Sequence, residues 1–122
     1  MKSVDVVNAL GALAQESRLA IYRLLVRRGP DGFTPGELTE KLDLPGPTLS
    51  FHLKELQHTQ LIESRRDGRF LYYSANFTQM HELVAFLTEN CCSLSNTECD
   101  SVCMPVKKSM NNVSSQRKRK RA

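Results

Sequence analysis

Apolar residues recur three or four positions apart in the first part of this chain, which is the spacing of one face of an α-helix. They are Val6, Leu10, Leu13 and Ala14, followed by Ile21, Leu24 and Leu25. The first set predicts a helix over about residues 3–14, and the second predicts a helix that ends at Gly29-Pro30. Two amphipathic helices are therefore expected before the first turn.

The next segment carries the signals of a short helix followed closely by a longer one. Thr34 and Glu37 have the spacing of a capping box, and Pro35 fits the first position of a helix that ends near Leu42. A further helix is predicted over about residues 47–57. Its apolar face consists of Leu49, Leu53 and Leu56.

The pattern then changes from helical to extended. The stretch LIESRRDGRFLYYSA holds two β-rich runs, and Asp67-Gly68 between them suits a two-residue hairpin turn. Asn76 and Gln79 form a weaker capping pair before a last helix that reaches about Glu89. The apolar stripe of that helix is Phe77, Met80, Leu83, Val84 and Leu87.

The predicted order is helix, helix, short helix, helix, hairpin, helix. A short helix and a second helix joined by a tight turn form the helix-turn-helix pattern, and a hairpin directly after it is a wing. The segments ESRLAIYRLL, GELTEKLDLPGPTLSFHLKELQ and LIESRRDGRFLYYS resemble the ArsR family of bacterial winged-helix repressors, which sense arsenite or metals. The resemblance implies a mainly α fold with a β-hairpin wing that binds an operator in double-stranded DNA.

The first and last helices have more apolar surface than a chain of this size is expected to bury alone. Phe86, which lies off the apolar stripe of the last helix, adds to that surface. The family resemblance implies that these terminal helices pair across a homodimer. A homodimer also suits two half-sites spaced one turn of DNA apart.

The face of the predicted second helix of the motif that lies opposite its leucines is expected to meet DNA. It presents Phe51 and Lys54, with Thr48 and Ser50 near the N-terminal end, where recognition helices contact base edges. The resemblance places Thr48, Ser50 and His52 near DNA. His52 lies close to the leucine face, so a packed or capping role and a DNA contact both stay open.

Basic residues at the predicted hairpin tip extend this DNA-binding surface. Arg65, Arg66 and Arg69 surround the turn and are expected to contact phosphate or the minor groove, although such charges also protect exposed strand edges. The predicted DNA contacts are Thr48, Ser50, Phe51, His52, Lys54, Arg65, Arg66 and Arg69.

The net charge of +4 over 122 residues hides an uneven distribution. Residues 107–122 hold 7 of the 17 basic residues, whereas the first 106 residues hold the other 10 and all 13 acidic ones. The tail is expected to be either a solvated segment or a non-specific DNA-tethering arm. No apolar run approaches the ~20 residues that span a bilayer, and no signal peptide is present, so a cytoplasmic protein without membrane contact is expected.

Four cysteines, Cys91, Cys92, Cys99 and Cys103, fall within thirteen residues after the last predicted helix. Reduced thiols are expected in the cytosol, so a metal or redox site is favoured over a structural disulfide. Arsenic-sensing relatives commonly carry cysteines in the first helix of the motif, but that helix reads PGELTEKLDL here. The chain instead resembles the family members with C-terminal cysteine sites.

Arsenite and antimonite are soft ions that take three thiolates, whereas zinc prefers four ligands. Cys91, Cys92 and Cys99 are therefore the predicted ligands of As(III) or Sb(III), with Cys103 spare or substituting. Binding of zinc, cadmium or lead and thiol–disulfide sensing remain as alternatives. No obligatory cofactor is expected.

The sequence thus predicts a winged helix-turn-helix domain over residues 1–90, a cysteine-rich metalloid-binding segment over 91–106 and a basic disordered tail over 107–122. It predicts a repressor that arsenite or antimonite releases from its operator. A winged-helix repressor that senses thiol oxidation, or zinc or cadmium, is the alternative. No nucleophile elbow, glycine-rich phosphate loop or HExxH motif occurs, so an enzyme is not expected.

Overall fold

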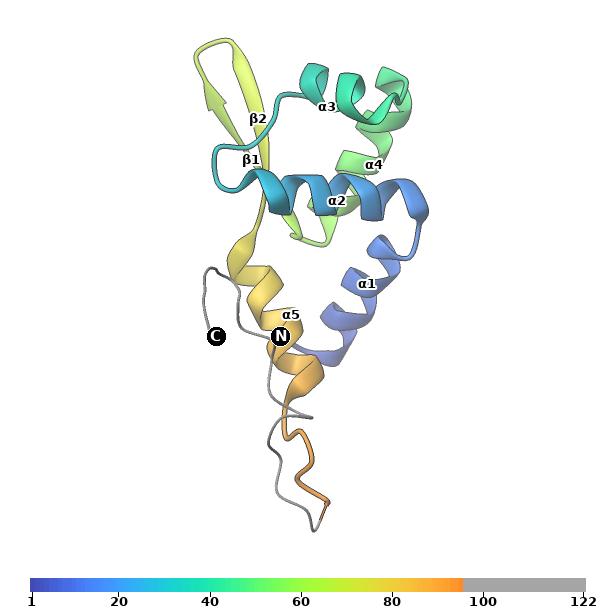
Figure 1. Cartoon of the computed structure of the whole chain (residues 1–122), viewed down its shortest axis with the longest axis vertical. Helices are drawn as coiled ribbons and strands as arrows, with labels where there is room; N and C mark the ends of the chain where they lie inside the picture. The colour runs from blue at the N-terminus through green and yellow to red at the C-terminus, as the bar shows by residue number, and fades with distance from the viewer. Residues whose placement is uncertain (96–122) are drawn as a thin grey trace, which may run out of the picture. The chain divides into compact units, whose positions relative to one another are not determined.

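The computed structural model describes residues 1–95 and divides the chain into two compact units (Figure 1). The first unit is Met1–Leu87 and the second is Thr88–Ala122, of which the structure describes residues 88–95. The predicted tail over residues 107–122 lies outside the described residues.

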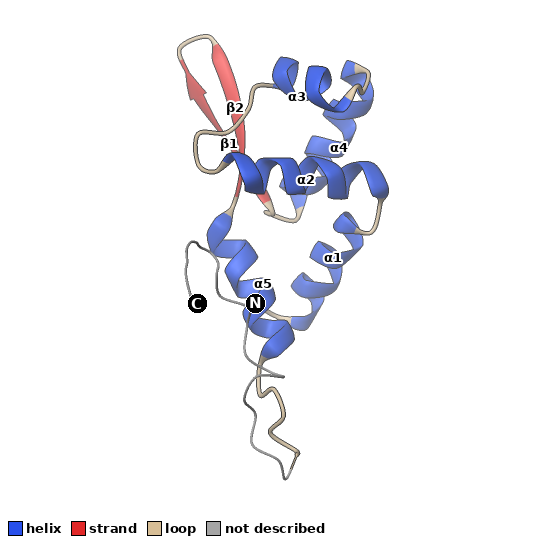
Figure 2. Ribbon diagram, in the orientation of Figure 1, coloured by secondary structure: helices blue, strands red, loops and turns tan. Residues whose placement is uncertain are grey.

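The observed elements follow the predicted order (Figure 2). They are α1 (Ser3–Leu13), α2 (Glu16–Arg28), α3 (Pro35–Leu42), α4 (Gly46–His58), β1 (Ile62–Asp67), β2 (Phe70–Ala75) and α5 (Phe77–Thr88). Every predicted element is confirmed, with ends that differ by one or two residues. None of the helices in residues 1–95 is long and apolar enough to cross a membrane.

One hydrophobic core joins the helices and the base of the hairpin. Helix α2 occupies its centre and packs against α1, α3, α4 and β2. The largest fully buried side chains come from α2, α3, α4 and the loop after α4, and they are Ile21, Leu25, Leu38, Leu49, Leu56 and Leu61. The leucine face predicted for residues 47–57 is therefore the face that α4 packs into the core.

The predicted apolar stripes of the two terminal helices are buried only in part. In α1, Val6 is buried as predicted together with Ala9, whereas Leu10 is exposed. In α5, Leu83 is buried and Phe86 packs against the core, whereas Val84 and Leu87 are exposed. The expectation that Phe86 lies on the surface is wrong, because Phe86 is half-buried and packs against the core, as Phe77 and Met80 do.

Candidate functional site

Helices α3 and α4 form the helix-turn-helix, and local hydrogen bonds set the start of α3. The Thr34 amide donates to Glu37 Oε1 at 2.9 Å, and the Glu37 amide donates to Thr34 Oγ1 at 3.2 Å. The predicted capping box is thus confirmed. The hydrogen bond from the Thr34 backbone also holds the pKa of Glu37 below its usual value. Asp43, with φ at 55°, ends α3 in the left-handed conformation and turns the chain toward α4.

Helix α4 divides cleanly into a buried and an exposed face. Its buried residues are Leu49, His52, Leu53 and Leu56. The other predicted DNA contacts on this helix, Thr48, Ser50, Phe51 and Lys54, are all exposed. The outward face is therefore free to meet a partner, and it combines two hydroxyls, one cation and one aromatic ring.

His52 belongs to the packed face, with only 7% of its side chain exposed. Burial lowers its pKa, and the positive charge of Arg18 lowers that pKa further. Its Nδ1 atom has no hydrogen-bond partner among residues 1–95. Of the two roles left open by the sequence, this geometry favours packing over DNA contact, because the imidazole is covered by its own domain.

The three arginines predicted at the hairpin do not form one cluster. Arg65 donates from Nη2 to the Asp31 carbonyl oxygen at 2.7 Å, and its guanidinium carbon lies 4.7 Å from the centre of the Tyr72 ring. The side chains of Arg66 and Arg69 are exposed and make no hydrogen bond or ion pair with residues 1–95. Arg65 therefore ties β1 to the α2–α3 loop, and Arg66 and Arg69 are unpaired cations within the part of the chain that the structure describes.

The hairpin is also fixed to the α2–α3 loop through its backbone. Phe33 and Tyr73 form a bridge, with the Phe33 amide donating to the Tyr73 carbonyl at 2.9 Å and the reverse bond at 2.8 Å. Gly32 approaches so closely that a Cβ atom there would lie 2.5 Å from the Tyr73 carbonyl oxygen. The angle of the wing is therefore set by long-range contacts, which the local sequence pattern did not reveal.

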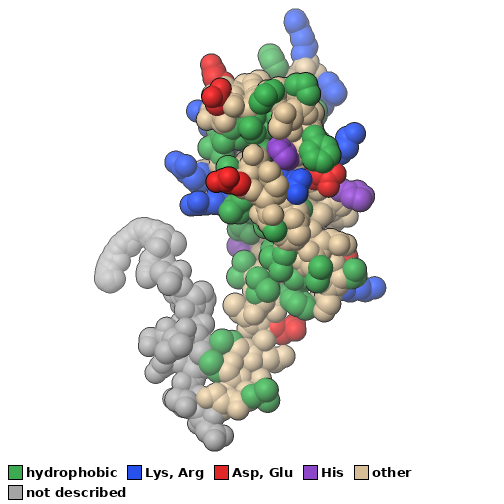
Figure 3. Space-filling model, turned by 90° about the vertical axis from the view of Figure 1, so that its right-hand side faces the viewer, with side chains coloured by type: hydrophobic (Ala, Val, Ile, Leu, Met, Phe, Trp, Pro, Cys, Tyr) green, Lys and Arg blue, Asp and Glu red, His purple; other side chains and the backbone are tan. Residues whose placement is uncertain are grey.

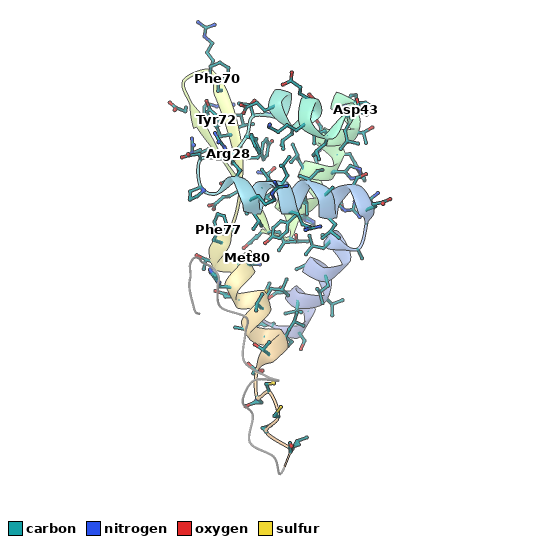
Figure 4. All side chains as sticks on the ribbon, viewed as in Figure 1. Arg28, Asp43, Phe70, Tyr72, Phe77 and Met80 are labelled. Carbon is teal, nitrogen blue, oxygen red and sulfur yellow. The ribbon has the colours of Figure 1, made fainter. Side chains whose placement is uncertain are left out.

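Aromatic side chains follow β2 toward the hairpin tip. Figure 4 shows Phe70 near the tip and Tyr72 farther along the strand, above Arg28. Phe70 is 58% exposed, and its ring centre lies 6.4 Å from that of Tyr72. Sequence reasoning passed over Phe70, although its place two residues after the Gly68 turn was a signal that it would lie at the tip.

The first turn of α5 is hydrogen-bonded to the loop that follows α4. Gln79 Nε2 donates to the Thr59 carbonyl at 3.2 Å, and Asn76 Nδ2 donates to the Gln60 carbonyl at 3.1 Å. The Asn76 amide also donates to the Leu61 carbonyl at 2.9 Å. These three bonds form a direct connection between the start of α5 and the end of the predicted recognition helix, and sequence reasoning did not find it.

Apolar side chains are exposed on both α1 and α5. This apolar surface of the two helices consists of Val4, Val7, Leu10, Val84 and Leu87. The two helices are neighbours at the start of α1, where the Met1 amino group lies 3.8 Å from Glu82 Oε1. Figure 3 shows hydrophobic side chains open to solvent on the face that it draws of the described residues. This surface gives the predicted pairing of terminal helices a physical basis.

The described part of the second unit contains two of the four cysteines. Cys91 is an exposed free thiol, and Cys92 is disulfide-bonded. Their Sγ atoms lie 3.7 Å apart. Asn90 and Cys92 have positive φ angles of 58° and 63°, so the chain turns sharply directly after α5.

The other two cysteines, Cys99 and Cys103, lie outside the described residues. Within residues 1–95, no group of three histidine, cysteine, aspartate or glutamate side chains is arranged to hold a metal ion. Of the three predicted ligands only Cys91 and Cys92 lie among the described residues, and the three-thiolate site stays a prediction.

Comparison with known proteins identifies similar regulators. A family model described as a helix-turn-helix domain matches residues 13–65. The transcriptional repressor SdpR of Bacillus subtilis is 31% identical over 80 residues, which cover 66% of this chain and 86% of that protein. The arsenical resistance operon repressor of Staphylococcus aureus is 31% identical over 107 residues, which cover 88% of this chain and 96% of that protein.

A solved structure with the same fold is the homodimeric winged helix-turn-helix DNA-binding domain of a possible ArsR-family regulator from Mycobacterium bovis. It superposes with a TM-score of 0.56 and 23% sequence identity over 78% of this chain and 88% of that chain. The arrangement of α3, α4 and the β1–β2 hairpin is therefore a helix-turn-helix followed by a wing.

Proposed function

Because the chain belongs to the ArsR family of winged helix-turn-helix transcriptional regulators, we propose that it is a repressor released from DNA by arsenite or antimonite. Its relatives are DNA-binding regulators and not enzymes. The observation that carries the proposal is the pair of sulfur atoms, Cys91 and Cys92, 3.7 Å apart directly after α5. The similarity to an arsenical resistance repressor over nearly its whole length supports the choice of ligand.

The proposed DNA contacts divide by chemistry. Thr48, Ser50 and Phe51, in the N-terminal half of α4, would contact base edges in the major groove. Lys54, Arg66 and Arg69 would contact phosphates, which supply affinity without sequence information. Arg65 would act through the position of the wing, because its guanidinium group is bonded within the chain.

The proposed active form is a homodimer that pairs the apolar surface of α1 and α5 with its copy. Val4, Val7, Leu10, Val84 and Leu87 are exposed in the single chain, and pairing would remove them from water. The M. bovis domain with this fold is homodimeric. A two-fold dimer would present two copies of α4 to an imperfect palindrome.

The proposed ligand chemistry needs three thiols. Arsenite, As(OH)₃, exchanges its three hydroxyl groups for three As–S bonds, and each thiol proton leaves with a hydroxyl group as water. Cys91 and Cys92 would supply two of these bonds, and Cys99 is proposed to supply the third. Cys103 is proposed to be spare. The disulfide at Cys92 would have to be reduced before this exchange.

Ligand binding would reach DNA through α5. The cysteines follow the last turn of this helix, and its first turn donates hydrogen bonds to the Thr59 and Gln60 carbonyls after α4. A small movement of α5 would thus change the position of α4 relative to its copy in the dimer. Allosteric couplings of ~1–3 kcal/mol correspond to a ~5–150-fold change in affinity, which is enough for release.

The test measures operator binding by fluorescence anisotropy under strong reductant, with and without arsenite. Cys91→Ser, Cys92→Ser and Cys99→Ser are each expected to bind the operator normally and to ignore arsenite. Cys103→Ser is the matched control and should still respond. Continued release of a protein that carries all three serines would refute the proposal, and X-ray absorption of the loaded protein would count the sulfur ligands.

A second candidate function is thiol–disulfide sensing, which the disulfide at Cys92 favours. A redox sensor would leave DNA on addition of peroxide and bind again on addition of reductant. An arsenite sensor would leave DNA while reductant is present throughout. Release under oxidation alone would therefore favour the second candidate.

A further inference from the structure

The outward face of α4 has a single large apolar side chain at its centre. Successive helical residues are rotated by about 100°, so Thr48 and Glu55 lie on one side of Phe51, and Pro47 and Lys54 lie on the other. The Phe51 side chain is 57% exposed and is not part of the hydrophobic core. It thus lies on the outward face of α4, away from the buried residues Leu49, Leu53 and Leu56.

The ring of Phe51 lies beside the buried ring of His52. Its centre lies 5.6 Å from that of His52, at an interplanar angle of 59°. His52 is buried, so the phenyl ring contacts the packed part of the domain on this side. Single exposed apolar residues are common on protein surfaces, so exposure alone says little. The informative feature is that this one lies at the centre of a recognition helix.

In the major groove, a phenyl ring can make a favourable apolar contact with one kind of base. A, G and C present hydrogen-bond donors and acceptors there, which a phenyl ring cannot satisfy, whereas thymine also presents its C5-methyl group. We propose that Phe51 selects thymine in each half-site by packing against this methyl group. This inference rests on the proposed operator binding and names one base that the operator must contain.

The side chains around Phe51 suit a supporting role. Thr48 and Ser50 are exposed hydroxyls near the N-terminal end of α4, and Lys54 is an exposed cation one turn after Phe51. Contacts of these groups with phosphates and base edges would hold α4 at the depth where the ring reaches the methyl group. Phe51 would then act as a specificity-determining residue rather than as a source of general affinity.

The experiment begins with the full-length protein and a random DNA library, from which bound sequences are selected. Each thymine in one half-site of the selected sequence is then replaced by deoxyuridine, which removes only the methyl group. One position is expected to lose affinity by about 4-fold, the ratio for burying one methyl-sized group. In Phe51→Ala, thymine and uracil at that position should bind equally well.

Phe70→Ala is the matched control, because Phe70 is exposed to 58% on the wing and not on α4. It should keep the full preference for thymine at the sensitive position. Phe51→Leu should keep part of that preference, since a smaller apolar group still contacts the methyl. Circular dichroism should show unchanged folding for all three variants, whose altered side chains lie outside the core.

The outcomes separate this inference from the proposed function. If a sequence is selected but no thymine is sensitive to uracil, the inference is wrong and the repressor proposal stands. If Phe51→Ala keeps the preference, another residue contacts the methyl and the inference is again wrong. If no sequence is selected at all, both proposals fail.

Discussion

The helix-turn-helix with its wing and the turn after α5 differ in how they are held. The first has buried side chains and long-range contacts, and the second has exposed side chains and local hydrogen bonds. Helix α4 buries four residues in the core, and the wing is held by the Phe33–Tyr73 bridge and by Arg65. In contrast, every residue from 88 to 95 is exposed, and Leu94 is exposed completely. The backbone hydrogen bonds of that turn join residues three apart, such as the Cys91 amide and the Thr88 carbonyl at 3.1 Å.

The difference would let a recognition surface and the proposed ligand-binding segment share one chain. A surface that discriminates between DNA sequences must be rigid before binding, because misplacement by an ångström weakens hydrogen bonds and packing. A segment that closes around an ion can begin open and gain order from the ion. In this protein, α5 connects the wing to the turn that holds Cys91 and Cys92.

The largest expected effect comes from removing core packing beneath the recognition helix. Leu56→Ala should lower the free energy of unfolding by ~2–5 kcal/mol, because Leu56 is fully buried and a cavity would remain. Leu94→Ala should change it by less than ~0.5 kcal/mol. Urea titrations at one fixed protein concentration measure both. Similar losses for the two variants would mean that the turn after α5 is packed as firmly as α4.

The next effect concerns the attachment of the wing. Gly32→Ala should destabilise the protein by about 3 kcal/mol, since φ is +75° and the new Cβ would clash with the Tyr73 carbonyl. Gly68→Ala at the hairpin tip is the control, with φ at +64° but open space around it, and should cost ~1–2 kcal/mol. Thermal unfolding compares the two variants. Equal costs would show that the contact with Tyr73 contributes nothing to the position of the wing.

A smaller effect tests the connection between α5 and α4. Gln79→Ala removes the hydrogen bond to the Thr59 carbonyl, and it should reduce the arsenite-dependent loss of DNA affinity by about 5-fold, equivalent to ~1 kcal/mol. Affinity without arsenite should stay nearly normal. Thr78→Ala, at an exposed neighbouring position, should respond as the wild type does. Anisotropy titrations with and without arsenite give the ratio, and an unchanged ratio in Gln79→Ala would exclude this route.

The smallest effect is a pH dependence that belongs to the helix-turn-helix alone. The pKa of His52 is lowered in the folded state by burial and by Arg18, so the unfolded state binds a proton first as the pH falls. Stability should therefore decrease as the pH drops below about 6.5, by less than ~1.4 kcal/mol per pH unit, and level off below the folded pKa. His52→Leu should flatten this slope in urea titrations from pH 7.5 to 5.5. An equal slope in the variant would assign the effect to other groups.

Much of the fold could be predicted from the sequence because the signals are local. The Thr34–Glu37 capping box, the turn at Asp67-Gly68 and the leucines of α4 each depend on residues a few positions apart. The exposure of Thr48, Ser50, Phe51 and Lys54 followed from the same helical period. The ligand role of the cysteines stays a prediction, and Cys99 and Cys103 lie outside the described residues.

Other parts of the candidate site depend on residues far apart in the chain. The Arg65 side chain donates a hydrogen bond to the Asp31 carbonyl, 34 positions away. The Gln79 side chain donates one to the Thr59 carbonyl, 20 positions away. No local pattern reports such partners. For the same reason the hairpin arginines looked equivalent in the sequence, although one of them is bonded within the chain.

The sequence by itself determined the order of elements, the two faces of α4 and the clustering of cysteines after the last helix. Helical period, caps and turns arise from interactions within a few residues, so the local amino-acid sequence specifies them directly. Only the tertiary structure decided that His52 is packed, that Phe86 is half-buried while Val84 and Leu87 are exposed, and that the wing is fixed through Gly32. Those outcomes depend on which element packs against each face, and these packing contacts form only when the chain folds.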